Sequence, residues 1–240
     1  MKTFILVHGG GHGAWAWEPV IGPLQSRGHT VRTLDLPGRD NQPSNVTLDD
    51  WVRRVGQEVD WALAAGLERP TLVGHSMGGL SVSQLAERRP ADISSVIYVC
   101  AVVPVDGENG LSTLAEGGLD SALLAEGALV PSEDGSCVTA TPDAAHKAFY
   151  SLCEDGVAAA ATSRLCAEPV APLSTPLSLG ANFASVRKSW IAATEDRTVP
   201  FALQERLAAR CGAPLTSIEA DHSPFFSATD ELVDLLVQLA

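Results

Sequence analysis

One segment constrains the fold more than any other: residues 72–79, Leu-Val-Gly-His-Ser-Met-Gly-Gly. It joins an apolar run to a stretch with a helical pattern. Gly74 and Gly78 flank Ser76 with the spacing of a sharp strand-to-helix turn. Larger side chains at the two glycine positions would collide with neighbouring backbone. We therefore expect a strand that ends just before Ser76 and a helix over 80–88. The serine hydroxyl should stand above the sheet end, at a helix N-terminus.

Strands and helices alternate on both sides of this turn. The remaining strands are expected over residues 3–7, 29–34, 95–101, 186–193 and 215–219. The remaining helices are expected over residues 17–27, 47–65, 201–210 and 230–239, and a loop over 36–43. Alternation of this kind predicts an α/β fold with about six mainly parallel strands flanked by helices.

The alternation stops at Pro104. From there to about Ser185 the sequence is rich in Ala and Gly, has a helical pattern and is interrupted repeatedly by proline. We interpret this stretch as a helical cap inserted into the core, not as an independent domain. The predicted division is a core of residues 1–103 and 186–240, with the cap insertion over 104–185.

Composition limits the classes of partner. The chain has 240 residues, a formal net charge of -13 and 45% apolar residues. The negative charge disfavours nucleic acids and anionic membrane surfaces as partners, and no window approaches a membrane span. The acidic residues are scattered, which is typical of a soluble surface. The sequence leaves the oligomeric state open, with a homodimer among the alternatives.

Cysteine usage indicates a reducing compartment. The cysteines are irregularly spaced and form no pairs of the kind that bind metals. Their odd number favours reduced, buried thiols over a disulfide framework, although a Cys153–Cys166 bridge stays open. The first apolar run is too short for a signal peptide. We therefore expect a cytoplasmic protein.

A serine hydroxyl becomes a useful nucleophile only with a base within hydrogen-bond reach and an acid that orients the base. Among the six histidines, only His222 lies in a loop just after the last predicted strand. Parallel strands bring such a loop to the same sheet edge as Ser76. We expect His8 to shape the glycine loop after the first strand, and the side chain of His75 to point away. We therefore predict His222 as the base.

The acid should end a strand that lies between the serine and the histidine in the sequence. Asp196 ends the strand that resumes after the cap, whereas the adjacent Glu195 should face away. Asp106, which follows the strand before the cap, is the alternative. Asp221 directly precedes the histidine and cannot easily fold back onto it. We predict Asp196, which completes the chain order serine, aspartate, histidine.

Acyl transfer also needs two N–H groups that stabilise the oxyanion. One is expected from the backbone of Met77, directly after the serine. The other should come from the glycine-rich loop after the first strand, where Gly10 is the predicted donor. Glycines in this loop let the backbone approach a substrate closely.

Taken together, these residues resemble the α/β-hydrolase superfamily, and the resemblance covers nearly the whole chain. More narrowly, the sequence is similar to the branch that holds plant methyl-ester esterases, hydroxynitrile lyases and bacterial esterases such as pyrethroid hydrolases. Residues 8–17, His-Gly-Gly-Gly-His-Gly-Ala-Trp-Ala-Trp, match the branch's opening His-Gly-x-x-His-Gly-x-Trp-x-Trp. The other matching segments are residues 74–79, 149–153, 185–188, 194–196 and 220–222.

The resemblance implies a serine carboxylesterase that hydrolyses small neutral methyl or aryl/alkyl esters through an acyl-enzyme, with no metal and no organic cofactor. Lyases of this branch carry threonine and lysine at the positions of Gly9 and Ser223. Without that hydroxyl and that cation, hydrolysis is favoured over carbon–carbon cleavage. The residues expected to contact substrate are Gly9, His12, Phe149, Leu152 and Phe225, with Phe226 a further wall candidate.

Three alternatives stay open at this point. Lactonase activity would use the same residues. A protein of this fold that binds a ligand without turnover would have the same pocket, although an intact triad disfavours it. A dinucleotide-binding protein fits the Gly-x-Gly-x-x-Ala pattern of residues 9–14 and Asp35 at the end of the next strand. Trp15 and Trp17 crowd the start of the helix that would bind pyrophosphate, which disfavours that function.

Overall fold

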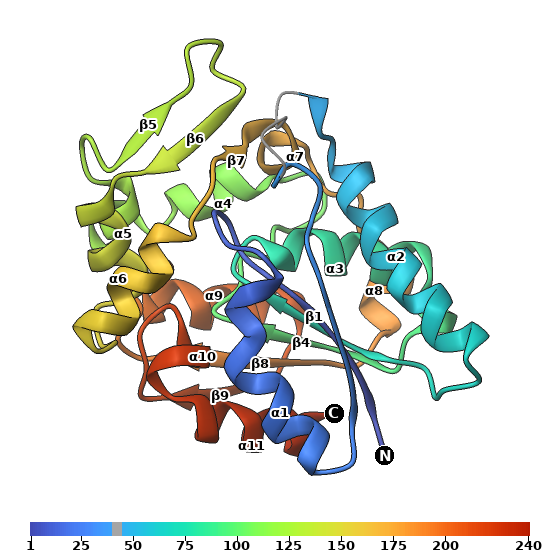
Figure 1. The fold of residues 1–240 in the computed structure, drawn as a ribbon. Coiled ribbons are helices and arrows are strands. Elements are labelled where there is room, and N and C mark those ends of the chain that lie inside the picture. Colours follow the sequence, from blue (N-terminus) through green and yellow to red (C-terminus); the bar gives the residue numbers. More distant parts are fainter. Residues whose placement is uncertain (40–44) are drawn as a thin grey trace.

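Six parallel strands form the central sheet of the computed structural model, which describes residues 1–39 and 45–240. Their spatial order is β2-β1-β3-β4-β8-β9 (Figure 1), which confirms the predicted six-stranded α/β sheet. The central strands are buried along their whole length, as expected when helices cover both faces. The strands are β1 Thr3–Val7, β2 Thr30–Leu34, β3 Thr71–His75, β4 Ser95–Val99, β8 Lys188–Ala193 and β9 Leu215–Ile218.

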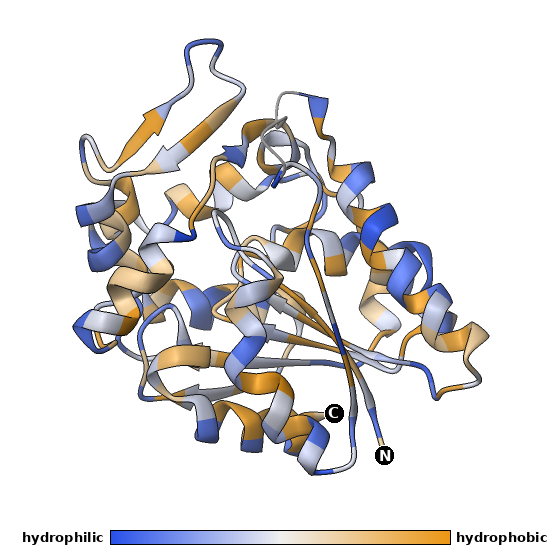
Figure 2. Cartoon of the chain, in the orientation of Figure 1, coloured by the Kyte–Doolittle hydropathy of each residue, from blue (hydrophilic) through white to orange (hydrophobic). Residues whose placement is uncertain are grey.

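Helices cover both faces of this sheet. Residues of α2, α3, α8 and α9 share one apolar cluster with the strands, and residues of α1, α10 and α11 share a second cluster on the other face. In Figure 2 the central strands carry apolar colours, whereas α2 has a hydrophilic outer side. The helices are α1 Glu18–Ser26, α2 Leu48–Ala64, α3 Gly78–Arg88, α8 Ala181–Ser185, α9 Phe201–Cys211, α10 Pro224–Ser227 and α11 Thr229–Leu239.

Local signals explain where several helices begin. The side chain of Thr47 accepts the Asp50 N–H at 3.2 Å, and the Asp50 carboxylate accepts the Thr47 N–H at 2.9 Å, so a capping box starts α2 as predicted. The helix predicted from residue 17 is preceded by a 3-10 turn, η1 Ala14–Trp17. The loop predicted over 36–43 falls partly on residues 40–44, outside the described residues.

The strand order reverses at β1, and this reversal sets the position of the site. The chain passes from β1 to β2 on one side, and then crosses to β3 on the other side of β1. The loops that follow β1 and β3 therefore diverge, and a crevice opens at the carboxyl ends of these strands. The two loops carry the glycines of residues 9–11 and Ser76.

The chain between β4 and β8 builds the cap, which is only partly helical. Its helices are α4 Gly110–Ala115, α5 Pro142–Phe149, α6 Asp155–Ser163 and α7 Val170–Ser174. It also contains an antiparallel sheet of β5 Leu129–Pro131, β6 Cys137–Ala140 and β7 Glu168–Pro169 (Figure 1). The pattern of residues 104–185 predicts helices alone. The small sheet corrects that prediction.

Turn chemistry explains the strands that periodicity does not predict. Residues 132–136, Ser-Glu-Asp-Gly-Ser, connect β5 to β6, and Gly135 has a φ of +68°. The Asp134 carboxylate accepts the Ser132 hydroxyl at 2.7 Å and the Ser136 N–H at 3.0 Å. Asp-Gly between two short apolar runs is a hairpin signal. The strands of three and four residues are too short to show a two-residue period.

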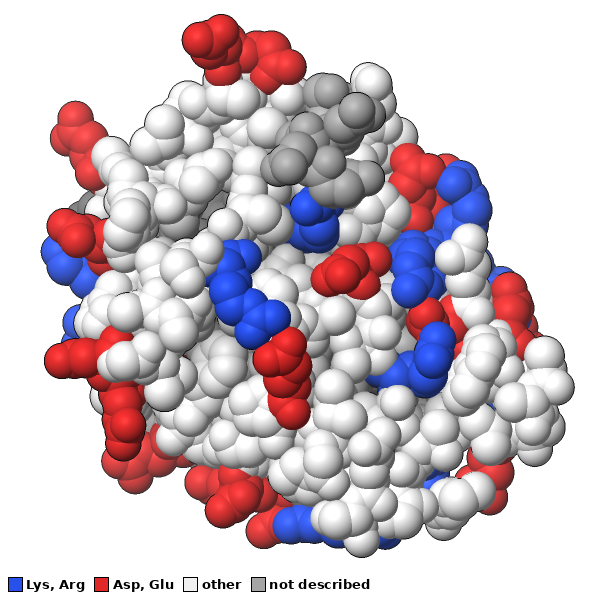
Figure 3. Space-filling view, in the orientation of Figure 1, with Lys and Arg blue, Asp and Glu red and all other residues white. Residues whose placement is uncertain are grey.

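Some features of the cap and surface bear on the sequence predictions. Helix α8, at the end of the inserted stretch, packs against α3 of the core. The boundaries at 103/104 and 185/186 stay a prediction. No helix within residues 1–39 and 45–240 is long and apolar enough to cross a membrane. On the face drawn in Figure 3, acidic and basic residues are interspersed among uncharged ones.

Candidate active site

Ser76 occupies a strained turn between β3 and α3. Its φ of +50° lies in the left-handed region, which costs a non-glycine residue about 1–3 kcal/mol. Backbone bonds hold it there, because its N–H donates to the Val99 carbonyl at 3.1 Å and its carbonyl accepts the Val102 N–H at 2.9 Å. The serine is therefore fixed at the carboxyl end of the sheet, where the sequence places it.

Three glycines leave room for this turn. A Cβ on Gly74 would lie 2.7 Å from a side-chain carbon of α3, and a Cβ on Gly78 would lie 2.7 Å from the His8 carbonyl oxygen. A Cβ on Gly9 would lie 2.7 Å from the Cβ of Ser76. The β1 loop, the turn and the helix thus approach one another too closely for side chains at these positions.

His222 joins Ser76 to Asp196. Its Nε2 lies 3.0 Å from Ser76 Oγ, and its Nδ1 lies 2.8 Å from Asp196 Oδ2. Because the carboxylate accepts, Nδ1 carries the proton, and Nε2 accepts the serine hydroxyl. Ser76, His222 and Asp196 are only 5%, 1% and 6% exposed, respectively. These bonds therefore form away from bulk water, where they are stronger. The structure brings together the three residues predicted as a triad.

The Asp196 carboxylate is itself held by the start of the following segment. The N–H groups of Thr198 and Val199 donate to its Oδ1 at 2.7 and 2.9 Å. The Gln204 side-chain amide, from α9, donates to Oδ2 at 3.1 Å. These donors fix the carboxylate so that Oδ2 faces the histidine ring, as an orienting acid requires.

His12 connects the glycine loop to the cap. Its Nδ1–H donates to the Gly10 carbonyl at 2.8 Å, and its Nε2 accepts the Tyr150 hydroxyl at 2.8 Å. Burial, opposed in part by the bond to Gly10, lowers the pKa of His12 to about 3. The ring is therefore neutral at neutral pH. His12 supports the loop and does not line the pocket of Ser76, which corrects its predicted contact with substrate.

His8 and His75 make structural contacts. The Nε2–H of His75 donates to the His222 carbonyl at 2.8 Å, so the residue before the serine supports the loop of the base. The Nδ1–H of His8 donates to the Gly9 carbonyl at 2.9 Å, while its Nε2 accepts the Leu36 N–H at 3.0 Å. Burial lowers the pKa of both rings, which are therefore neutral.

The other acidic candidates do not contact the histidine ring. Asp106 and Glu195 are exposed. Asp221 is buried, and its carboxylate accepts the Leu152 N–H at 2.9 Å and the Ser223 N–H at 3.0 Å. Asp221 therefore anchors a turn of the cap to the loop that carries the base.

The predicted oxyanion donors border the same pocket as the nucleophile. Gly10 and Met77 line it together with Ser76. Within the described chain, neither of their N–H groups donates to another protein group. Met77 is also the N-cap of α3, whose positive end favours negative charge. The two N–H groups can therefore donate hydrogen bonds to a developing oxyanion.

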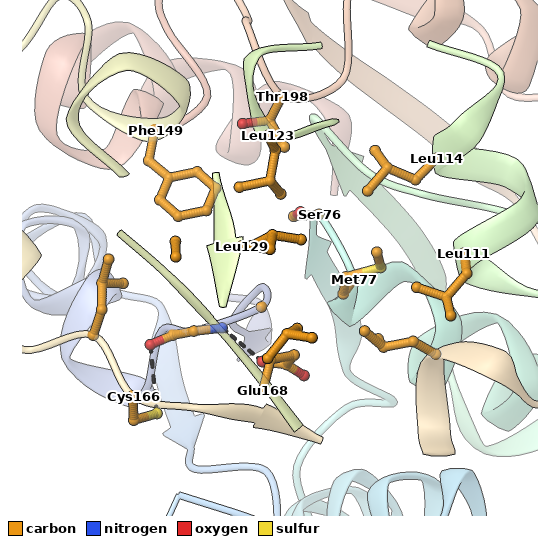
Figure 4. Close-up of a pocket in the computed structure, with 16 residues that line it drawn as sticks. Ser76, Met77, Leu111, Leu114, Leu123, Leu129, Phe149, Cys166, Glu168 and Thr198 are labelled. Carbon is orange, nitrogen blue, oxygen red and sulfur yellow. Dashed lines mark hydrogen bonds between the residues drawn. The ribbon is translucent and has the colours of Figure 1, made fainter. Parts of the chain in front are cut away.

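Ser76 lies in an apolar pocket that the cap covers (Figure 4). A mostly apolar lining around one reactive hydroxyl suits a small-molecule ligand. The apolar wall of the pocket includes Leu111, Leu114, Leu123, Leu129, Phe149 and Leu173.

Of the residues predicted to contact substrate, Phe149 lines this pocket and the others do not. Leu152 is 51% exposed at the surface, because its turn directs the backbone N–H, and not the side chain, inward to Asp221. Phe225 is fully buried in the core beside the ring of His75. Gly9 lies against Ser76 but outside the pocket wall. These positions correct the predicted wall.

The pocket wall also contains Glu168, a residue that no motif indicates. Its Oε2 accepts the Arg39 guanidinium at 2.7 Å and the Gly11 N–H at 2.6 Å. Burial alone would lower the pKa of Arg39, but the Glu168 carboxylate more than offsets this effect and raises it. The bond between Gly11 and Glu168 joins residues 157 positions apart, so no local pattern could predict it.

One side-chain group among the described residues could bring three metal ligands together. The ligand atoms of Cys100, Asp196 and His222 lie within 4.8 Å of one another. Burial, and then the Asp196 charge, raise the pKa of the Cys100 thiol well above its usual value, so the thiol stays protonated. Both ring nitrogens of His222 already have partners. This donor set fits a hydrogen-bonded triad better than a metal site.

Comparisons with known proteins agree with this architecture. Residues 4–235 match the model of the Alpha/beta hydrolase family. Esterase PIR7B of Oryza sativa subsp. japonica is 32% identical over 260 residues, which cover 100% of this chain and 96% of that protein. The resemblance predicted from the motifs is thereby confirmed.

Two further relatives extend the comparison. Putative methylesterase 11, chloroplastic, of Arabidopsis thaliana is 31% identical over 255 residues, which cover 99% of this chain but span 63% of that protein's length. The crystal structure of the pyrethroid hydrolase PytH with BIF superimposes with a TM-score of 0.84 at 22% identity, over 99% of this chain and 96% of the other. That likeness concerns the fold.

Proposed function

The chain belongs to the alpha/beta hydrolase family, and from that premise we propose that it is a serine carboxylesterase that acts on small neutral esters. One observation carries the proposal. The hydroxyl of Ser76 hydrogen-bonds a buried histidine, His222, whose other nitrogen is held by Asp196, and the hydroxyl opens into an apolar pocket. This arrangement performs acyl transfer without a metal or organic cofactor.

In the first half of the reaction, Ser76 Oγ attacks the ester carbonyl and forms a bond to its carbon. His222 Nε2 accepts the hydroxyl proton as the bond forms, and Asp196 stabilises the resulting imidazolium. The N–H groups of Met77 and Gly10 stabilise the oxyanion of the tetrahedral intermediate. His222 then returns the proton to the leaving alcohol oxygen, and the acyl group stays on the serine.

In the second half, water takes the place of the alcohol. His222 Nε2 accepts a proton from the water, whose oxygen attacks the acyl carbon. The intermediate again places its oxyanion at Met77 and Gly10. Collapse breaks the bond to Ser76 Oγ, which recovers the proton from the imidazolium, and the carboxylic acid leaves.

The glycine loop supports hydrolysis over the lyase chemistry found in the same branch. The branch's lyases have threonine at the position of Gly9, but a Cβ there would lie 2.7 Å from both His75 Nδ1 and Ser76 Cβ in this chain. Their lysine position holds Ser223, whose buried side chain carries no charge. The names of the relatives, esterase PIR7B and methylesterase 11, support the same ester chemistry.

The remaining predictions on partners and location also stay proposals. A small ester is the partner that the apolar pocket supports. The five cysteines are free thiols in the structure, Cys153 and Cys166 included, which supports a cytoplasmic location.

Ser76→Ala tests the proposed function. With a chromogenic short-chain ester, loss of the nucleophile should lower kcat by about 10^6-fold, because the members of a triad act as a unit. Ser81→Ala is the matched control. It removes a buried hydroxyl one turn further along, whose contact is the Gly78 carbonyl, and should change kcat by less than about 3-fold. Retained turnover in Ser76→Ala would refute the proposal.

A further inference from the structure

Among the described residues that line the pocket, Glu168 alone carries a charge. The rest of the wall is mostly aliphatic, and the hydroxyl of Thr198 already donates to the Ala148 carbonyl at 2.8 Å. The Glu168 side chain is 8% exposed. Its carboxylate packs on the oxyanion loop, since a Cβ on Gly10 would lie 3.5 Å from Glu168 Oε2. An ionised group is thus built into an apolar pocket beside the reacting centre.

The two oxygens of this carboxylate differ in their partners. Oε2 accepts both the Arg39 guanidinium and the Gly11 N–H. Oε1 is buried and has no hydrogen-bond partner within the described chain. In Figure 4 a dashed line, the hydrogen bond from the Gly11 N–H, ends on one oxygen of Glu168, and no dashed line reaches the other. A buried acceptor without a donor is costly, and a ligand in the pocket could supply the donor that the described residues do not.

The neighbouring charges define the chemistry of that donor. Arg39 compensates the Glu168 charge, which leaves little net attraction for a cation. A carboxylate on the ligand would be repelled by Oε1. A neutral O–H group satisfies Oε1 and still fits the apolar surroundings.

We infer that Glu168 Oε1 accepts a hydroxyl group of the substrate, so that the preferred esters carry a hydroxyl away from the ester group. The inference rests on the proposed esterase function and names its substrate class. Glu168 is then a specificity-determining residue. Its Oε2 holds the oxyanion loop through Gly11, and its Oε1 selects the ester that this loop receives.

Matched esters test the inference. The panel is methyl 3-phenylpropanoate and its three derivatives with one ring hydroxyl (ortho, meta and para), because the saturated spacer keeps the ring hydroxyl from altering the reactivity of the ester carbonyl. We expect the wild type to prefer at least one hydroxylated isomer by about 10- to 100-fold in kcat/KM, as for a hydrogen bond to a charged acceptor. Equal rates on the four esters, zero included, would overturn the inference.

Two variants then assign the preference to Glu168. Glu168→Gln removes the charge but keeps the shape, and Arg39→Met with Glu168→Met removes both partners and leaves no buried charge unpaired. We expect the ratio between hydroxylated and plain ester to fall to within about 3-fold of unity in both. If Glu168 only held Gly11, the four rates would fall together and the ratio would survive, which would overturn the inference.

Two controls separate this result from the proposed function. Glu18→Gln makes the same change at an exposed glutamate paired with Arg164, and it should leave rates and ratio unchanged. Hydrolysis of p-nitrophenyl acetate, lost in Ser76→Ala, reports the esterase function by itself. If that activity is present without hydroxyl preference, only the inference fails; if it is absent, the proposed function fails.

Discussion

The carboxyl edge of the sheet and the cap above it form the two sides of one pocket, but they contribute different kinds of side chain to it. At the sheet edge, Ser76 has a strained backbone. Both ring nitrogens of His222 and both carboxylate oxygens of Asp196 have hydrogen-bond partners. The cap contributes aliphatic side chains from helices, short strands and turns, such as Leu114 and Leu129, and one carboxylate, Glu168. We therefore expect reaction chemistry and substrate choice to depend on separate stretches of chain.

Many polar contacts join these two sides, and three of them hold loops beside the triad. The Tyr150 hydroxyl donates to His12, the Leu152 N–H donates to Asp221, and the Gly11 N–H donates to Glu168. Each bond joins a cap segment to a loop of the core. If the division between the sides is real, changes at the sheet edge should affect all esters alike, and changes in the cap should affect esters selectively.

The largest effect is expected from Asp196→Asn. The amide oxygen should stay with the N–H groups of Thr198 and Val199, so the NH2 group faces His222 Nδ1 and cannot accept its proton. The ring then adopts the other tautomer, in which Nε2 is protonated and cannot accept the serine proton. We expect kcat to fall by about 10^4-fold, as in other triads. Steady-state kinetics on short and bulky esters should show the same factor for both. A loss below about 10-fold, or one confined to a single ester, would contradict the division.

A smaller effect concerns His12, the residue that bridges loop and cap. Its pKa is about 3 in the folded chain and near 6.5 when unfolded, so the unfolded chain binds more protons between these values. Stability is therefore lost as pH falls from about 6.5 towards 3. Between pH 7 and 5, His12 should account for about 2 kcal/mol of this loss.

His12→Asn provides the comparison, because its amide can still donate to the Gly10 carbonyl. Urea unfolding at pH 7 and pH 5 should show a shallower pH dependence in the variant, although His8 and His75 contribute in the same direction in both proteins. Identical pH dependence would show that folding does not lower the pKa of His12.

The smallest effect is expected from Leu129→Ala in the cap. The smaller side chain enlarges the pocket and leaves the triad residues unchanged. We expect kcat on a given ester to stay within about 3-fold, while the kcat/KM ratio of bulky to short acyl esters rises by about 10-fold. A common fall of 100-fold or more on both esters would mean that the cap wall supports the triad, and the two sides would not be separable.

The sheet edge was predictable from sequence because its signals are local. Glycines fix the turn at Ser76, and Asp196 and His222 each follow the end of a predicted strand. Because the carboxyl ends of parallel strands meet at one edge of the sheet, the three residues come together there. The capping box of α2 is equally local. The bounds of these strands and helices in the structure differ only slightly from the predicted ones.

The cap was less predictable because its contacts are not local. Its strands are too short for periodicity, and the Asp-Gly signal at 134–135 was the one available cue. Leu152 and Phe225 are apolar, but whether an apolar side chain faces a pocket, a core or solvent depends on packing between distant segments. The pairing of Glu168 with Arg39 and Gly11 is of the same kind.

The most direct test of the account is covalent labelling with a fluorophosphonate, read by intact-mass and peptide mass spectrometry. We predict one adduct per chain, on the peptide that contains Ser76, and much slower labelling in His222→Ala. No adduct, or an adduct on any other residue, would contradict it.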